Sequence, residues 1–315
     1  MIALRQIDHV CLRVADLDEA VARWTIQFGL TERRREKNRA FLACGYEPYS
    51  LELLAEGEPG FDHQAFELAS DCSLDVAAAH LDRHGVSYVV REGSLHLADA
   101  DGFGLALLPH RSADDRWPDV ARSTTVLPGF RPRKLGHTSV LAGDLAAQTA
   151  FYRDVLGMRI TDRLADVGAW LHCNADHHVV ALVGQGNPHF HHLAFEVVDW
   201  GEIRVALDHL AQHGRWVSWG PLRHGLGRNL SVYIRIPEEE LFVEIFADME
   251  QLESDHVPRD WPDDVHSSNV WGILPPRSYF RFDQAAVEAE RTGLEARGEG
   301  LPPADVIAPT VEMET

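Results

Sequence analysis

The chain carries the same phrase twice, and this repeat limits the possible fold more than any other feature of the sequence. FDHQAFEL at residues 61–68 returns as FHHLAFEV at residues 190–197, with a histidine in the same position. Two further pairs of segments match at nearly the same spacing of 128 or 129 residues: DHVCLRVADLDEAVARW at 8–24 with GHTSVLAGDLAAQTAFY at 136–152, and HLDRHG at 80–85 with HLAQHG at 209–214. Several matches in one register indicate a duplicated domain.

Each half of the duplication is itself divided into two similar units. Each unit opens with an alternating stretch typical of a strand, continues with a helical pattern, and ends with strand candidates separated by turn residues. In the first unit we expect the helix to begin after Asp16, a suitable N-cap, and to end at Gly29. The sequence therefore predicts an α+β protein in which four βαβββ modules are paired into two tandem domains.

The length of 315 residues is sufficient for two domains that each bury a core. We place an N-terminal domain at residues 1–115 and a second domain at residues 134–250. The polar segment between them, residues 116–133, is rich in proline and arginine and is expected to be a linker. The extension at residues 251–315 is irregular in composition; we expect a short helix from Asp283 and a disordered end.

Charge and cysteine usage limit the partners and the compartment. The chain has 29 lysines and arginines against 49 aspartates and glutamates, and a net charge of −20 argues against nucleic acid as a partner. No apolar run approaches the length that spans a bilayer, and the amino terminus has no secretory signal pattern. Cys11, Cys44, Cys72 and Cys173 lack C-x-x-C spacing, which is typical of a reducing compartment. We therefore expect a cytoplasmic protein without membrane partners.

The two halves differ where each domain ends. The second half closes with the strand-like segment IPEEELFVEIF, in which Glu244 lies among aliphatic and aromatic residues. The first half closes with DADGFGLALLP, and the position that matches Glu244 is Ala106. The first half therefore keeps two histidines, His9 and His63, but lacks this carboxylate.

The second half has all three groups: His137, His192 and Glu244. Two histidines and one carboxylate form the facial triad of non-haem iron(II) oxygenases, which leaves open positions for a bidentate substrate and dioxygen. A carboxylate in the middle of an apolar strand is costly to bury unpaired, and a bound cation would explain its presence. We therefore predict that these three residues bind iron(II), with manganese(II) as an alternative.

This arrangement resembles the vicinal oxygen chelate superfamily, and within it the type I extradiol ring-cleaving dioxygenases. The resemblance covers residues 1 to about 280 and is strongest in the motifs GHTSV, HHLAFEV, GPLRHGLGRNLSVYIRIP and FVEIF. It implies that a catecholic substrate is cleaved with dioxygen to a muconic-semialdehyde-type product. It further implies an N-terminal domain without activity, a C-terminal tail over the active site and a homotetramer.

The resemblance also implies roles for individual residues. Tyr233 and His224 would hydrogen-bond the two substrate oxygens, and His178 would be the acid-base group that faces dioxygen. If residues 177 and 178 lie on a strand, they point to opposite faces, and the resemblance selects His178. Trp170 would line the ring pocket. Arg277 could pair with a substrate carboxylate, although a surface position is the simpler interpretation.

Three other histidines of this region are not assigned to the site. We expect exposed or rim positions for His177, His189 and His191. Three alternative functions stay open: a glyoxalase-type isomerase, a hydroxyphenylpyruvate-type dioxygenase and a non-catalytic small-molecule binding protein. Glyoxalase chemistry usually uses four protein ligands, whereas the sequence offers three.

Overall fold

A computed structural model describes residues 1–45, 47–112, 130–184, 187–281 and 292. Most of the proposed linker, the helix expected from Asp283 and the end of the chain lie outside these residues.

The first half forms one sheet from two βαβββ modules. Its elements are β1 (Leu4–Arg13), α1 (Leu17–Ala22), a π-helical turn η1 (Arg23–Gln27), β2 (Thr31–Arg35), β3 (Arg39–Ala43), β4 (Leu51–Leu54), β5 (Gly60–Leu68), α2 (Leu74–Arg83), β6 (Tyr88–Arg91), β7 (Ser94–Ala98) and β8 (Gly104–Leu108). The strand order is β2-β3-β4-β1-β5-β8-β7-β6. The opening strands of the two modules, β1 and β5, are antiparallel neighbours in the middle.

The second half repeats this plan and adds one strand. Its elements are β9 (Lys134–Ala142), α4 (Leu145–Ala150), η3 (Phe151–Val155), β10 (Arg159–Leu164), β11 (Gly168–His172), β12 (Val180–Gly184), β13 (His189–Glu196), α5 (Trp200–Gln212), β14 (Val217–Arg223), β15 (Leu230–Ile236), η4 (Pro237–Glu239), β16 (Leu241–Ala247), β17 (Arg259–Trp261), α6 (Val265–Ser268) and η5 (Arg277–Phe280). The order is β14-β15-β16-β13-β9-β12-β11-β10-β17. The predicted α+β fold with four βαβββ modules is confirmed.

Corresponding helices start for the same local reason in both halves. The side chain of Asp16 accepts a hydrogen bond from the backbone N–H of Glu19, and that of Asp144 accepts one from Ala147. Such caps satisfy backbone donors that a helix leaves unpaired at its N-terminus. Gly29 follows the first helix with a φ of 70°, a conformation that favours glycine. The predicted cap and end of the first helix are therefore confirmed, although its last turn is π-helical.

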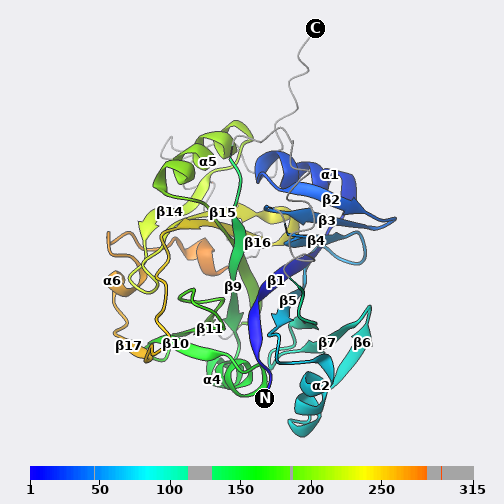
Figure 1. Ribbon diagram of the computed structural model, residues 1–315. Coiled ribbons are helices and arrows are strands. Elements are labelled where there is room, and N and C mark those ends of the chain that lie inside the picture. Colours follow the sequence, from blue (N-terminus) through cyan, green and yellow to red (C-terminus); the bar gives the residue numbers. More distant parts are fainter. Residues whose placement is uncertain (46, 113–129, 185–186, 282–291, 293–315) are drawn as a thin grey trace.

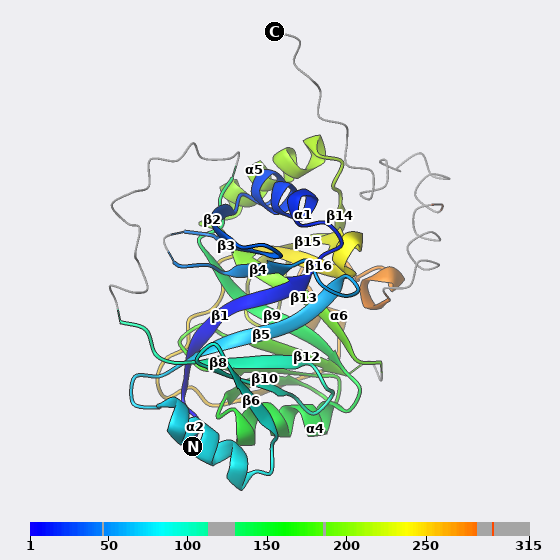
Figure 2. The same cartoon turned by 90° about the vertical axis from the view of Figure 1, so that its right-hand side faces the viewer.

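The two halves pack against each other along β1 and β9, which lie side by side in the middle of the molecule (Figure 1). In both views α1 and α5 lie at one end and α2 and α4 at the other (Figures 1 and 2). Phe61 of the first half stacks on Phe190 of the second, with ring centroids 4.0 Å apart. Gln64 donates a buried hydrogen bond of 2.6 Å to the hydroxyl of Tyr152. Apolar stacking and a satisfied polar contact therefore fix how the halves are oriented.

Among the described helices, none is long and apolar enough to cross a membrane.

Candidate metal centre

The three predicted metal ligands lie on neighbouring strands of the second sheet. His137 is on β9, His192 on β13 and Glu244 on β16, and β13 lies between the other two strands. Ala194 of β13 pairs with both His137 and Glu244 across the sheet. Because side chains alternate along a strand, His192, two residues from Ala194, points to the same face as the other two ligands.

The three side chains converge on one point. The Nε2 atom of His137 lies 3.0 Å from Oε2 of Glu244, and the Nε2 atom of His192 lies 3.1 Å from the same oxygen. All three side chains are buried, and within the described part of the chain His192 Nε2 has no hydrogen-bond partner. Two imidazole nitrogens and one hard oxygen, with a nitrogen left free, fit a divalent ion such as iron(II) or manganese(II).

The second oxygen of Glu244 is held by the protein. Oε1 accepts hydrogen bonds from the Ser231 hydroxyl at 2.5 Å and from the Asn229 amide at 2.9 Å. Burial alone would raise the pKa of this carboxyl group, but the imidazoles of His137 and His192 hold it well below its usual value. Glu244 is therefore an oriented carboxylate whose Oε2 faces the two histidines.

A cavity of about 300 Å³ opens over the three ligands. Its walls are mostly apolar, and four predicted site residues line it: Trp170, His178, His224 and Tyr233. An apolar pocket with a few convergent polar groups is typical of a binding site for a small molecule.

His178 lies at the end of a buried chain of hydrogen-bonding groups. Its ring centroid is 4.2 Å from that of His137, and its Nδ1 lies 3.0 Å from Nδ1 of His177. On the other side, His177 Nε2 lies 3.0 Å from a carboxylate oxygen of Asp162, which is also paired with Arg259. With Asp162 accepting from His177 Nε2–H, the neutral His177 accepts from His178, and Nε2 of His178 carries the lone pair. Burial, together with the charge of His137, holds the pKa of His178 well below its usual value.

His224 and Tyr233 form a second polar pair in the cavity. The carbonyl of Ser268 accepts a hydrogen bond from Nδ1 of His224 at 2.7 Å, so Nε2 of His224 accepts one from the Tyr233 hydroxyl at 2.8 Å. Burial raises the pKa of Tyr233 well above its usual value, and the charge of Glu244 raises it further. Tyr233 therefore keeps its proton near neutral pH and is a hydrogen-bond donor.

Two of the histidines that we had placed at exposed or rim positions are buried. His177 is 0% exposed and His191 is 1% exposed, so the prediction is wrong for both; His189 is partly buried. His177 and His178 also do not lie on a strand but in the segment before β12, and the argument from opposite strand faces does not apply. Asp162 is the buried partner of His177. The carbonyl of Tyr279 lies 2.7 Å from Nε2 of His191. Neither partner is adjacent in sequence to its histidine, so a local pattern does not reveal the contact.

Residues from the extension also line the cavity, and sequence reasoning did not identify them. Leu274, Pro275, Tyr279 and Phe280 contribute to its walls. The Tyr279 ring lies 5.1 Å from that of Tyr233. The backbone of Arg277 begins η5, but its side chain lies outside the described part of the structure, so its predicted contact with a substrate carboxylate stays a prediction.

The first half lacks an acid in the position of Glu244, as predicted. Ala65 pairs with Ala106 where Ala194 of the second half pairs with Glu244. A different carboxylate, Glu52 of β4, nevertheless reaches the first-half histidines. The sequence comparison missed Glu52 because it compared only equivalent positions of the two halves.

Known proteins are similar to this chain in sequence and in fold. Residues 134–248 match the model of the Glyoxalase/Bleomycin resistance protein/Dioxygenase superfamily. Metapyrocatechase 2 of Cupriavidus necator is 35% identical over 312 residues, covering 90% of this chain and 93% of that protein.

Two solved structures have the same fold at low identity. A mutant of homoprotocatechuate 2,3-dioxygenase from Brevibacterium fuscum aligns with a TM-score of 0.78 at 20% identity, over 89% of this chain and 82% of that one. A Mn(II)-bound glyoxalase from Novosphingobium aromaticivorans aligns with a TM-score of 0.75 at 21% identity, over 89% and 94% of the two chains. At such identities the likeness extends to the fold alone.

Proposed function

Because this chain belongs to the vicinal oxygen chelate superfamily and, within it, to the extradiol dioxygenases related to metapyrocatechase, we propose that it opens the ring of a catechol. The reaction is meta cleavage of a catecholic aromatic with dioxygen to a muconic-semialdehyde-type product, as in the catabolism of aromatic compounds. The observation that carries the proposal is the convergence of His137, His192 and Glu244 at the floor of an apolar cavity.

We propose that these three residues hold iron(II), with manganese(II) as the alternative. When bound, such an ion would supply a path for electron density between the catechol ring and dioxygen. The oriented carboxylate of Glu244 and the two buried imidazoles keep the remaining face of the site open toward the cavity.

The other residues of the cavity position the substrate. The Tyr233 hydroxyl lies 2.8 Å from His224 Nε2, so together they can offer one donor and one acceptor to the two oxygens of a catechol. Trp170 lies on the cavity wall, where its ring can pack against the substrate ring. The apolar walls exclude water from the reacting groups.

His178 is the proposed acid-base residue. Burial favours its neutral form, and the chain through His177 to Asp162 leaves Nε2 as the basic nitrogen. It can therefore take up a proton that the catechol loses and return it later to an oxygen atom of the intermediate.

The test is an aerobic assay on iron(II)-loaded protein with catechol, in which the yellow ring-fission product is followed by absorbance. Wild type and Glu253→Gln, which changes an exposed carboxylate, should form the product, whereas Glu244→Ala should lose the iron held at the ring-cleaving site and the activity. Metal analysis of the active protein separates iron from manganese. A protein that is fully loaded with either metal and does not cleave any of a panel of substituted catechols would refute the proposal.

We also propose the larger organisation expected from the sequence: domains at residues 1–115 and 134–250, joined by a linker at 116–133, in a homotetramer. Support comes from the two separate sheets, which end at Leu108 and begin at Lys134. A cytoplasmic location is part of the same proposal and is supported by four free cysteines. If the protein sediments as a monomer at micromolar concentration, the proposed homotetramer is wrong.

A further inference from the structure

The first half keeps the geometry of a metal-binding histidine pair. His9 of β1 and His63 of β5 correspond to His137 and His192 of the second half. The ring centroids of His9 and His63 lie 5.4 Å apart at an interplanar angle of 79°, and those of His137 and His192 have the same distance and angle. The first half therefore presents its histidine pair in the same geometry as the second half.

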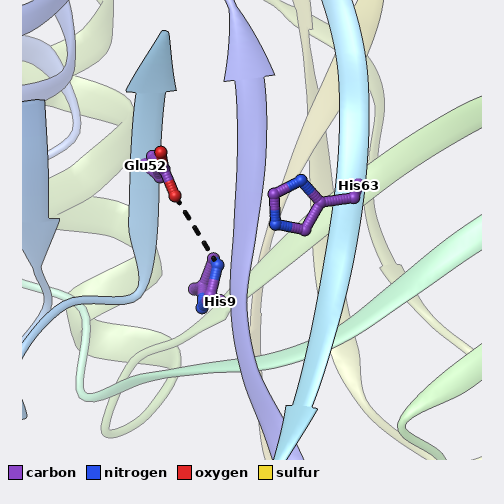
Figure 3. A group of neighbouring side chains, drawn as sticks. All are labelled: His9, Glu52 and His63. Carbon is purple, nitrogen blue, oxygen red and sulfur yellow. Dashed lines mark ion pairs between the residues drawn. The ribbon is translucent and has the colours of Figure 1, made fainter. Parts of the chain in front are cut away.

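A carboxylate reaches this pair from the opposite side. Glu52 lies on β4, where it pairs with Cys11 of β1; the equivalent position in the second half is Ala181, which pairs with Ser139. Oε2 of Glu52 lies 3.8 Å from Nε2 of His9, and one donor atom from each of His9, Glu52 and His63 lies within 4.8 Å of the others. Figure 3 shows the three side chains on β1, β4 and β5, turned toward a common point.

Both imidazoles are held by other carboxylates on their far side. Nδ1 of His9 lies 2.6 Å from Asp8, and Nδ1 of His63 lies 2.8 Å from Asp62. An imidazole that donates Nδ1–H to its carboxylate and is otherwise unprotonated carries its lone pair on Nε2. A histidine whose second ring nitrogen donates to a carboxylate is the usual arrangement of a metal ligand.

Glu52 also has a competing partner that a test must take into account. Its Oε1 lies 3.5 Å from Nε of Arg39, which in turn pairs with the exposed Glu92. Arg39 alone would explain a carboxylate at this place, but it would not explain why the carboxylate lies beside two imidazoles. The side chains of His9, Glu52 and His63 are 4%, 8% and 11% exposed, so a charge here is largely removed from water.

We propose that His9, Glu52 and His63 form a second metal site, which binds Zn²⁺. Imidazole and carboxylate are ordinary zinc ligands at about 2.0–2.2 Å, so two of them on one tetrahedral ion lie about 3.4 Å apart. The 3.8 Å between Nε2 of His9 and Oε2 of Glu52 is close to this separation. Because the site joins β1, β4 and β5 and is buried, the ion stabilises the first sheet.

Zinc bound at this site can be measured independently of the catalytic centre. Chelator-treated Glu244→Ala protein, in which the ring-cleaving site is disabled, is reloaded with Zn²⁺ alone, passed over a desalting column and analysed for zinc per chain. We expect one zinc ion per chain in this variant, none after Glu52→Gln is added, and one after Glu92→Gln is added as the matched carboxylate control. Zinc should also raise the melting temperature of the first and third proteins but not of the second.

Absence of zinc from the folded Glu244→Ala protein would overturn the proposal, as would retention of zinc when Glu52→Gln is added. If the Glu52→Gln protein does not fold, as judged by circular dichroism, His63→Asn in the same background replaces it and should also abolish binding. Because zinc content is the readout, the proposal can fail while the ring-cleavage proposal holds, and the reverse.

Discussion

The hydroxyl of Ser231 is expected to control how tightly the catalytic site binds metal, although it is not itself a ligand. It donates a 2.5 Å hydrogen bond to Oε1 of Glu244, and both side chains are fully buried. Ser231→Ala removes this donor without adding volume and leaves the Asn229 amide, at 2.9 Å, as the remaining donor to Oε1 of Glu244. The carboxylate then gains freedom to turn Oε2 away from the two histidines.

The size of the effect follows from the type of bond. A hydrogen bond to a charged group contributes about 1.5–3 kcal/mol, and loss of an outer partner of a metal ligand typically lowers metal affinity about 10–100-fold. Since the Asn229 amide still donates to the same oxygen, we expect the lower part of this range, about 10–30-fold.

Equilibrium dialysis of chelator-treated protein against Mn²⁺, which is stable in air, gives the dissociation constant directly. Ser139→Ala is the control, because Ser139 is another buried serine that lines the same cavity. If the two variants bind Mn²⁺ equally tightly, the hydrogen bond to Oε1 does not orient Glu244, and this reasoning is wrong.

Three further outcomes are expected. His178→Asn should retain metal and bind catechol anaerobically but turn over about 10²–10⁴-fold more slowly, whereas His192→Asn should form no catechol–metal complex; equal loss of metal in both would make His178 a ligand. Burial lowers the pKa of His172 to about 4, below its value in the unfolded chain, so unfolding takes up a proton and stability falls as pH drops from about 6.5 to 4. In urea titrations, the free energy of unfolding of His172→Gln should fall by up to about 3 kcal/mol less than that of wild type between these pH values. An equal fall in both proteins would show that His172 does not cause this pH dependence. Tyr152→Phe should lower the free energy of unfolding by about 1–3 kcal/mol, because it removes the partner of Gln64 between the halves; an unchanged urea midpoint would refute this.

The repeat made much of the fold and the catalytic ligands predictable. Once the two halves are superimposed, one alternating stretch around His137 and one around His192 define two central strands, and the buried acid at Glu244 completes the set. This worked because period-two alternation and helix caps are local properties that the sequence records directly.

Contacts between distant segments were not predictable in the same way. Glu52 meets the first-half histidines only because β1 pairs with β4 in a register that sets Cys11 opposite Glu52, and no local pattern encodes that register. The burial of His177 likewise depends on Asp162 and Arg259, which come together only when β17 joins the edge of the second sheet.

The long separation of the catalytic ligands has a consequence for how the protein folds. His137 and Glu244 are 107 residues apart in the chain, and the strand that carries His192 must be inserted between theirs. Closing such a loop is entropically costly, so the three donor atoms converge only after the central strands of the second sheet have assembled. Metal therefore cannot serve as a nucleus for folding. An ion held by these three residues would bind the finished sheet, so we expect it to slow unfolding and to leave the folding rate unchanged.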